Sequence, residues 1–137
     1  MSKQVTFNDS FSKLDGAIDA AAEKKVRGVA EAIVDYAVSI SPVDTGAYVE
    51  SFSVVPRGAG GGRMRSSNGR AKAPNPIAVQ EQEAARLKSD LDNIDIVESG
   101  GFVLRNRAPH ANRVETGEDW PITEGYYVFL KTKDKFR

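Results

Sequence analysis

The residues of this chain that could do chemistry are few, and they do not converge in the sequence. His110 is the only histidine, and it lies in NRAPHANRVE without an HExxH pattern or a second imidazole nearby. The carboxylates Asp90, Asp92 and Asp95 lack the glycine turn of a calcium-binding loop. No serine lies in a G-x-S-x-G elbow, and the chain has no cysteine. We therefore expect no catalytic residues, no metal site and no cofactor, and we expect that the protein is not an enzyme.

A basic, glycine-rich segment runs from Pro56 to Pro76 and is called the arm below. Its sequence, PRGAGGGRMRSSNGRAKAPNP, has no acidic residue and too little apolar surface to offset the entropy of ordering. It also lacks the G-x-x-x-x-G-K-[ST] pattern that cradles phosphates. We predict a flexible loop inserted between the first strand and the second helix.

The cations of the arm could bind phosphates in a sequence-independent way, or they could bind an acidic protein surface. The Glu81–Asp95 face of a neighbouring copy is one such surface, and the arm has no aromatic residue on which bases could stack. Protein contact is therefore favoured, and nucleic-acid binding stays open as the alternative. The five cationic residues are Arg57, Arg63, Arg65, Arg70 and Lys72.

A sharp corner is predicted in SPVDTGAYVESF, residues 41–52. Pro42 ends a helical pattern because proline disfavours helical geometry in the residue before it. The side chains of Asp44 and Thr45 can accept hydrogen bonds from backbone amides, and Gly46 permits a positive φ or a close backbone approach. We interpret this stretch as a structural corner that sets the helix against a sheet.

The elements around this corner indicate an α+β fold. An apolar stripe with spacings of three and four predicts a helix from Phe11 to Ile40, too long for so small a domain to cover alone. A second helix is predicted over Ile77–Leu91. Alternating or branched residues predict strands over Tyr48–Val55, Phe102–Asn106 and Tyr126–Thr132. Ile94–Glu98 is predicted to form a hairpin with Phe102–Asn106 through Ser99-Gly100-Gly101.

Length and composition agree with a single domain over residues 1–137. The chain has a formal net charge of zero, so charge gives no general reason to expect nucleic-acid or membrane binding. It has no apolar run long enough to span a membrane and no secretory signal, which predicts synthesis in a cytoplasm. The fold we expect is a long N-terminal helix packed on a small antiparallel sheet, with a second helix and the arm.

Two motifs, in order, resemble a family of phage proteins. SPVDTGAYVESF resembles the "aP-x-dTGxL-x-xS" corner of small tailed-phage proteins related to minor tail protein Z. FVLRNRAPHANRVETGEDWP, residues 102–121, resembles the "N-x-aPYAxxxExG" strand and loop of the same family. The matching loop-motif positions are Asn106, Ala108, Pro109, Ala111, Glu115 and Gly117.

The resemblance implies a structural protein of the phage neck or tail that forms a ring, expected to be a hexamer. Such a ring would complete the tail or join it to the head. Its implied partners are adjoining neck, tail-tube or tail-terminator proteins, with non-specific contact to DNA in the channel. Its implied location is the virion, after assembly in the host cytoplasm. Asn106 and Glu115 are expected to act through hydrogen bonds, or Glu115 through an ion pair with a neighbouring subunit. Nucleic-acid binding by the arm and a small hydrolase or toxin are the rival readings.

Overall fold

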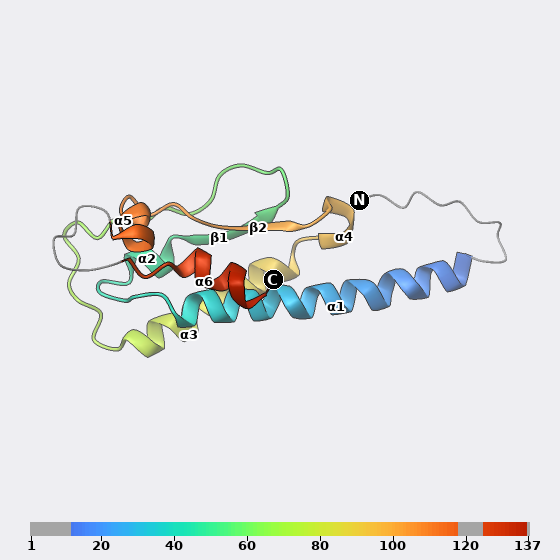
Figure 1. Cartoon of the computed structure of the whole chain (residues 1–137), viewed down its shortest axis with the longest axis horizontal. Coiled ribbons are helices and arrows are strands. Elements are labelled where there is room, and N and C mark those ends of the chain that lie inside the picture. Colours follow the sequence, from blue (N-terminus) through green and yellow to red (C-terminus); the bar gives the residue numbers. More distant parts are fainter. Residues whose placement is uncertain (1–11, 118–124, 137) are drawn as a thin grey trace.

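The computed structural model describes residues 12–117 and 125–136, with side chains from residue 21 onward. Figure 1 shows helices gathered around a two-stranded antiparallel sheet, which confirms the α+β class. The elements in chain order are α1 (Ser12–Ser39), α2 (Ala47–Glu50), β1 (Phe52–Pro56), α3 (Pro76–Asp92), α4 (Ile96–Ser99), β2 (Phe102–Asn106), α5 (Ala111–Thr116) and α6 (Val128–Lys135). Among these described helices, none is long and apolar enough to cross a membrane.

The two long helices form where the sequence predicts them. α1 covers most of the predicted Phe11–Ile40 stretch, and α3 matches Ile77–Leu91 with one further residue at each end. Asn75 caps α3 because its side-chain oxygen accepts a hydrogen bond from the amide of Ala78 at 3.1 Å. Pro76 at the first position suits a helix start, since its missing N–H would have no partner there.

The predicted hairpin around Ser99-Gly100-Gly101 is wrong. Residues Ile96–Ser99 form a helical turn, because the Asp95 carboxylate accepts a hydrogen bond from the Glu98 amide at 3.0 Å. Gly100, with φ 77°, closes this turn. The strand β2 pairs instead with β1, antiparallel, in a register that runs from Phe52↔Asn106 to Pro56↔Phe102.

Two other predicted strands are partly or wholly helical. The first half of Tyr48–Val55 belongs to the helical turn α2, and the strand begins only at Phe52. Tyr126–Thr132 contains the start of α6 and no strand. Val128 and Thr132 are both buried at a spacing of four residues, so helical packing outweighs the β propensity of this segment.

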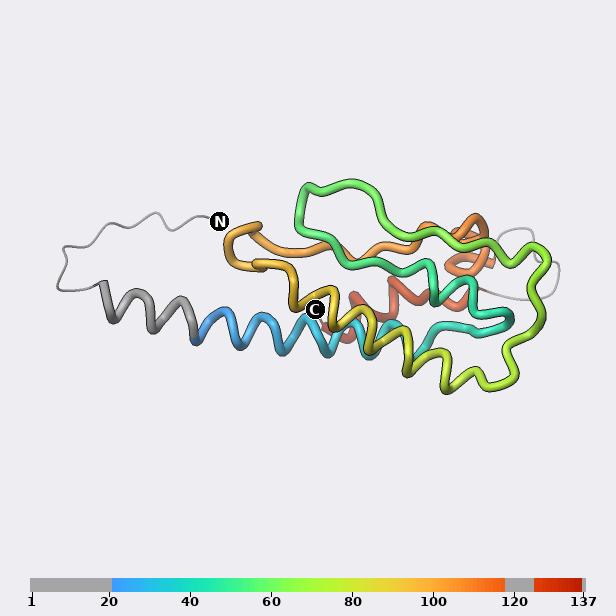
Figure 2. Tube along the Cα trace, turned by 180° about the vertical axis from the view of Figure 1, so that it is seen from behind, coloured from blue at the N-terminus to red at the C-terminus, as the bar shows by residue number. Residues whose placement is uncertain are grey.

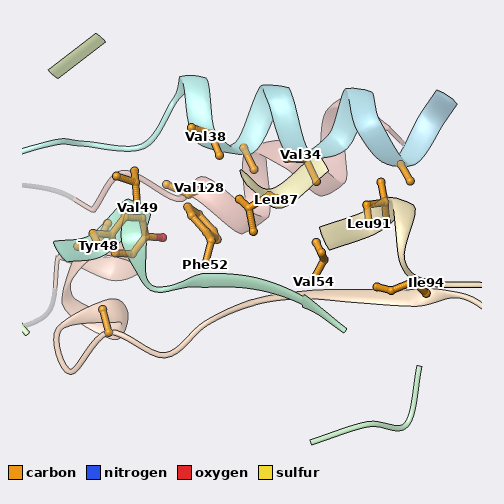
Figure 3. Close-up of a cluster of buried hydrophobic side chains, with 14 of the residues drawn as sticks. Val34, Val38, Tyr48, Val49, Phe52, Val54, Leu87, Leu91, Ile94 and Val128 are labelled. Carbon is orange, nitrogen blue, oxygen red and sulfur yellow. The ribbon is translucent and has the colours of Figure 1, made fainter. Parts of the chain in front are cut away.

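The hydrophobic core lies between the sheet and the helices α1, α3 and α6. Phe52 is fully buried at its centre, with its ring 5.3 Å from that of Tyr48 and 5.9 Å from that of Phe129. Figure 3 shows Phe52 pointing from β1 toward Val128 and Leu87. The sheet, α3 and the last helix therefore share one apolar centre.

Among residues 21–39 of α1, the core covers the part from Ala30 onward. Arg27 fixes the helix to the body by donating hydrogen bonds to the carbonyls of Leu91 and Ile94, at 2.7 and 2.8 Å. Ala30 is the first buried residue, and none of the side chains at positions 21–29 is buried. Figures 1 and 2 show the earlier part of α1 extending past the other elements.

Candidate functional site

The predicted corner is a tight turn held by its own backbone and hydroxyl groups. The buried hydroxyl of Ser41 donates a hydrogen bond to the carbonyl of Ala37 at 2.6 Å, which closes the end of α1. Gly46 has φ 94° and begins α2. The side-chain oxygen of Thr45 accepts a hydrogen bond from the amide of Ala47 at 3.3 Å. Gly46 thus has a positive φ, and Thr45 accepts a hydrogen bond from one backbone amide as a turn residue, not as the N-cap of α2.

The corner is also tied to α3 and to the arm. Gln80 of α3 donates a side-chain hydrogen bond to the carbonyl of Ser41 at 2.9 Å, just before Pro42. The carbonyl of Asp44 accepts a hydrogen bond from the amide of Ala73, at the end of the arm, at 2.6 Å. Asp44 therefore contributes through its backbone to the path of the arm.

The first residue of the loop motif joins this motif to the corner. The side-chain amide of Asn106 donates a hydrogen bond to the carbonyl of Tyr48 at 2.8 Å. Its oxygen accepts a hydrogen bond from the amide of Ala108 at 3.0 Å, which turns the chain after β2. Ala108 is buried, and Pro109 follows it in the turn before α5. Asn106 thus fixes two segments that lie more than fifty residues apart in the sequence.

Glu115 caps a helix that begins thirteen residues later. Its two carboxylate oxygens accept hydrogen bonds from the amides of Phe129 at 3.0 Å and Leu130 at 3.1 Å. These are the second and third residues of α6, whose amides an N-cap side chain normally satisfies. Gly117, with φ 76°, closes α5 two residues beyond Glu115. The loop motif therefore holds the last helix in place.

Two substitutions of Glu115 should distinguish how much its hydrogen bonds and its negative charge each contribute to stability. We expect Glu115→Ala to lower the free energy of unfolding by about 1–2 kcal/mol, because two amides of α6 lose their acceptor. Glu115→Gln keeps an oxygen acceptor and should lose less than half of that. Urea titration followed by circular dichroism measures both values. Equal losses in the two variants would show that the negative charge, and not the hydrogen bonding, stabilises α6.

The corner and the loop motif meet at one small cavity of about 220 Å³. Burial and, to a smaller extent, the neighbouring Arg113 lower the pKa of His110 below its usual value. Burial, with a smaller contribution from Glu115, raises the pKa of Tyr48. Within the described ranges, no group of histidine, cysteine and acidic side chains could hold a metal ion. The residues that line the cavity are Pro42, Asp44, Thr45, Gly46, Ala47, Tyr48, Ser67, His110, Val114 and Tyr126.

Part of the arm is bound to its own subunit. Arg70 forms a two-pronged ion pair with Glu50, with nitrogen–oxygen distances of 2.7 and 3.2 Å. Arg63 lies 3.7 Å from Glu83, a carboxylate that is only 6% exposed and that also accepts a hydrogen bond from Arg86 at 2.6 Å. The acidic face predicted to receive the arm thus supplies one of its contacts within the same chain.

Ser51, just before β1, and Ser53 of β1 hold the middle of the arm by accepting hydrogen bonds from its backbone amides. The amide of Arg63 donates to the hydroxyl of Ser53 at 2.6 Å, and the amide of Arg65 donates to the hydroxyl of Ser51 at 2.7 Å. The guanidinium of Arg57 donates to the carbonyl of Gly100 at 3.4 Å. Lys72, near the end of the arm, is exposed.

The ion pair between Glu50 and Arg70 should make stability depend on pH. The hydrogen bond from Arg70 is the main cause that lowers the pKa of Glu50 below 4.5. A carboxylate whose pKa is depressed on folding stabilises the fold above its unfolded pKa and loses this contribution as pH falls through the folded value. Arg70→Gln should therefore flatten the fall in unfolding free energy between about pH 5 and pH 3. Lys72→Gln removes the same charge from the arm and serves as the control, with an unchanged pH profile.

The structural roles of three side chains cannot be predicted from the sequence. Glu83 looks like a solvated residue of an acidic helix face, but Arg63 and Arg86 surround it. Arg86 also donates a hydrogen bond to the carbonyl of Phe52 at 2.9 Å. The role of Arg27 depends on carbonyls more than sixty residues away. Nothing in the local pattern distinguishes these residues from ordinary surface charges.

Comparison with known proteins gives one family. No curated protein and no solved structure matches the chain. A family described as "Bacteriophage HK97-gp10, putative tail-component" matches residues 6–117. The match spans the corner, the arm and the loop motif, in agreement with the resemblance of the two motifs to small tail proteins. The chain belongs to the HK97 gp10-like family of phage tail components.

Proposed function

We propose that this tail component is a ring-forming structural protein of the phage neck or tail. The ring completes the tail or joins it to the head, and its subunits are copies of this chain, with six expected per ring. Adjoining neck, tail-tube or tail-terminator proteins contact its two faces. The protein acts by assembly in the host cytoplasm and then remains in the virion.

The observation that carries this proposal is an exposed apolar stripe on α1. Val26 is 44% exposed and Val29 is 47% exposed, on one side of the helix. Ile33 continues the same stripe, with spacings of three and four residues. Ile33 lies beside Leu104 and Phe129 of its own subunit, whereas Val26 and Val29 are left largely uncovered by the described residues. A neighbouring copy in a ring would cover them.

The arm does not favour nucleic-acid binding over this proposal. A protein that binds nucleic-acid phosphates through arginine needs guanidinium groups that are not already in ion pairs. Arg63 and Arg70 are instead within ion-pair distance of Glu83 and Glu50. Any non-specific contact with DNA in the channel would come from the arm's other cationic side chains, Arg57, Arg65 and Lys72.

The stripe on α1 provides the test. The Val26→Glu/Val29→Glu variant should weaken self-association by at least about tenfold, because charge replaces apolar surface that would be buried between copies. Sedimentation velocity and native mass spectrometry of the purified chain over a range of concentrations measure the effect. Both methods also give the number of subunits.

A matched control adds the same two charges elsewhere on the helix. Ala21 and Gly28 are exposed, and helical geometry places them about 80° or more around α1 from each residue of the stripe. Ala21→Glu/Gly28→Glu should leave association unchanged. A wild-type chain that stays monomeric at all concentrations, or equal losses in the two variants, would overturn the proposed role of α1 in the ring.

A further inference from the structure

The outer edge of β2 carries backbone groups that are free to pair. Hydrogen bonds from Arg107 to Ser51 and from Arg57 to Gly101 flank the β1–β2 register. In an antiparallel pair the bonded positions alternate, so β2 bonds to β1 through its odd-numbered residues. The N–H and C=O groups of the even-numbered residues point away from β1, and none has a partner in the described part of the chain. These residues are Phe102, Leu104 and Asn106.

The corresponding edge of β1 offers fewer free backbone groups. Pro56, at the end of the strand, has no N–H to offer. The carbonyl of Phe52 already accepts a hydrogen bond from Arg86 of α3 at 2.9 Å. Among the described residues, the β2 edge is therefore the more open of the two to a further strand.

An apolar groove lies beside the open edge. Its volume is about 400 Å³, enough for a large side chain. Proteins normally protect an exposed edge strand with charge or cover. An edge with free backbone groups next to an apolar pocket has the features of a strand-addition site, in which main-chain bonds give affinity and the pocket selects a side chain. The groove is lined by Ile33, Leu104, Phe129, Thr132, Lys133 and Phe136.

We propose that the segment Gln4–Asn8 of a neighbouring copy adds to this edge as a third strand and places Phe7 in the groove. The segment reads QVTFN, in which apolar Val5 and Phe7 alternate with polar neighbours. This period of two, with β-branched residues at Val5 and Thr6, is typical of a strand with one buried face. The inference rests on the proposed ring, whose subunit contacts it extends.

The length of the chain requires a second copy. Ser12 begins α1, and Ile33 lines the groove twenty-one residues later, about 32 Å along the helix axis. From Ser12, the five residues back to Phe7 reach at most about 18 Å when fully extended. The difference is larger than two side chains can bridge, so Phe7 cannot enter the groove of its own subunit.

A positive charge at the groove is complementary to a negative charge that follows the Gln4–Asn8 segment. Lys133 lies in the lining and is exposed. Asp9 follows Phe7 by two residues, so it lies on the same side of an extended segment. A head-to-tail contact of this kind, in which each copy gives its segment to the next, closes into a ring when the rotation allows.

Disulfide trapping between two populations of the full-length chain tests the proposal. The natural sequence has no cysteine, so any disulfide comes from the introduced pair. One population carries Phe7→Cys, and the other carries Leu104→Cys with a mass tag. After mixing and mild oxidation, we expect a covalent heterodimer of distinct mass on a non-reducing gel. Phe136→Cys, at another position of the groove, should trap Phe7→Cys as well, which guards against local damage from a single variant.

The control is Thr6→Cys, because neighbouring residues of a strand point to opposite sides. It should give at least about fivefold less heterodimer than Phe7→Cys, and sedimentation velocity of the same samples reports whether rings form. Rings without heterodimer above the Thr6→Cys level would overturn the strand-addition site and leave the ring intact. A separate Phe7→Cys/Leu104→Cys double variant that forms its disulfide within single chains, with no heterodimer in the mixture, would overturn the exchange between copies. Absence of any association would overturn this inference together with the proposed ring.

Discussion

The Phe52→Ala variant is expected to lose about 3–5 kcal/mol of unfolding free energy, the largest effect of any single change considered for this fold. Phe52 is fully buried, and its ring touches Tyr48 beside the corner and Phe129 of α6. Truncation would leave a cavity at the point where sheet and helices share their core. Urea unfolding followed by far-ultraviolet circular dichroism measures the loss.

The matched control for this cavity is Phe52→Leu. It keeps an apolar side chain of similar reach, so we expect a loss of about 1–1.5 kcal/mol. A loss below about 1 kcal/mol for Phe52→Ala would mean that the surrounding core collapses to fill the space, and that Phe52 is not the centre of the fold.

Gly46→Val should lower the unfolding free energy by about 2–3 kcal/mol. Gly46 has φ 94°, which a β-branched residue adopts only under strain. A side chain there would also have its first carbon 3.0 Å from the carboxylate of Glu50, which Arg70 holds in place. Thermal unfolding and urea titration would both detect a loss of this size.

A substitution of a second glycine serves as a control, because it is expected to raise the unfolding free energy. Gly28 lies in the exposed middle of α1, and no atom lies within 4 Å of an added side-chain carbon. Gly28→Ala should therefore raise the unfolding free energy by about 0.5–1 kcal/mol, because alanine favours helix. A Gly46→Val variant as stable as the wild type would show that the corner tolerates a negative φ, against the conformation described here.

The sequence predicts most accurately those elements that have an apolar repeat over many residues or a residue that clearly starts or ends a helix. The apolar stripe of α1, with Pro42 after it, and the helical stretch Ile77–Leu91 of α3 are of this kind. Asn75 and Pro76, which start α3, lie in the stretch predicted as the arm. The strand Phe102–Asn106 is also predicted with its correct bounds. Each of these signals is local, so no partner elsewhere in the chain is needed to interpret it.

The wrong predictions share a different cause. Short apolar runs fit either a strand or a buried helical turn, and distant groups decide between them. Glu115 supplies the cap for α6, although no residue pattern near Tyr126–Thr132 indicates the start of a helix. In the candidate site, the meeting of corner and loop motif depends on the Asn106–Tyr48 hydrogen bond, which no local pattern encodes.

The pairing of β1 with β2 has a consequence for the order of folding. The two strands join positions that are 46 to 54 residues apart, from Pro56↔Phe102 to Phe52↔Asn106. Such long-range contacts close slowly, because the entropy of the intervening loop is lost before any bond forms. The contacts between α1 and α3 have a similar range, from 41 residues between Ser39 and Gln80 to 64 residues between Arg27 and Leu91. The sheet and this helix pair are therefore expected to form together, late in folding. The exposed strand edge would then appear only in nearly folded subunits, which limits the time that unfinished chains have to aggregate through it.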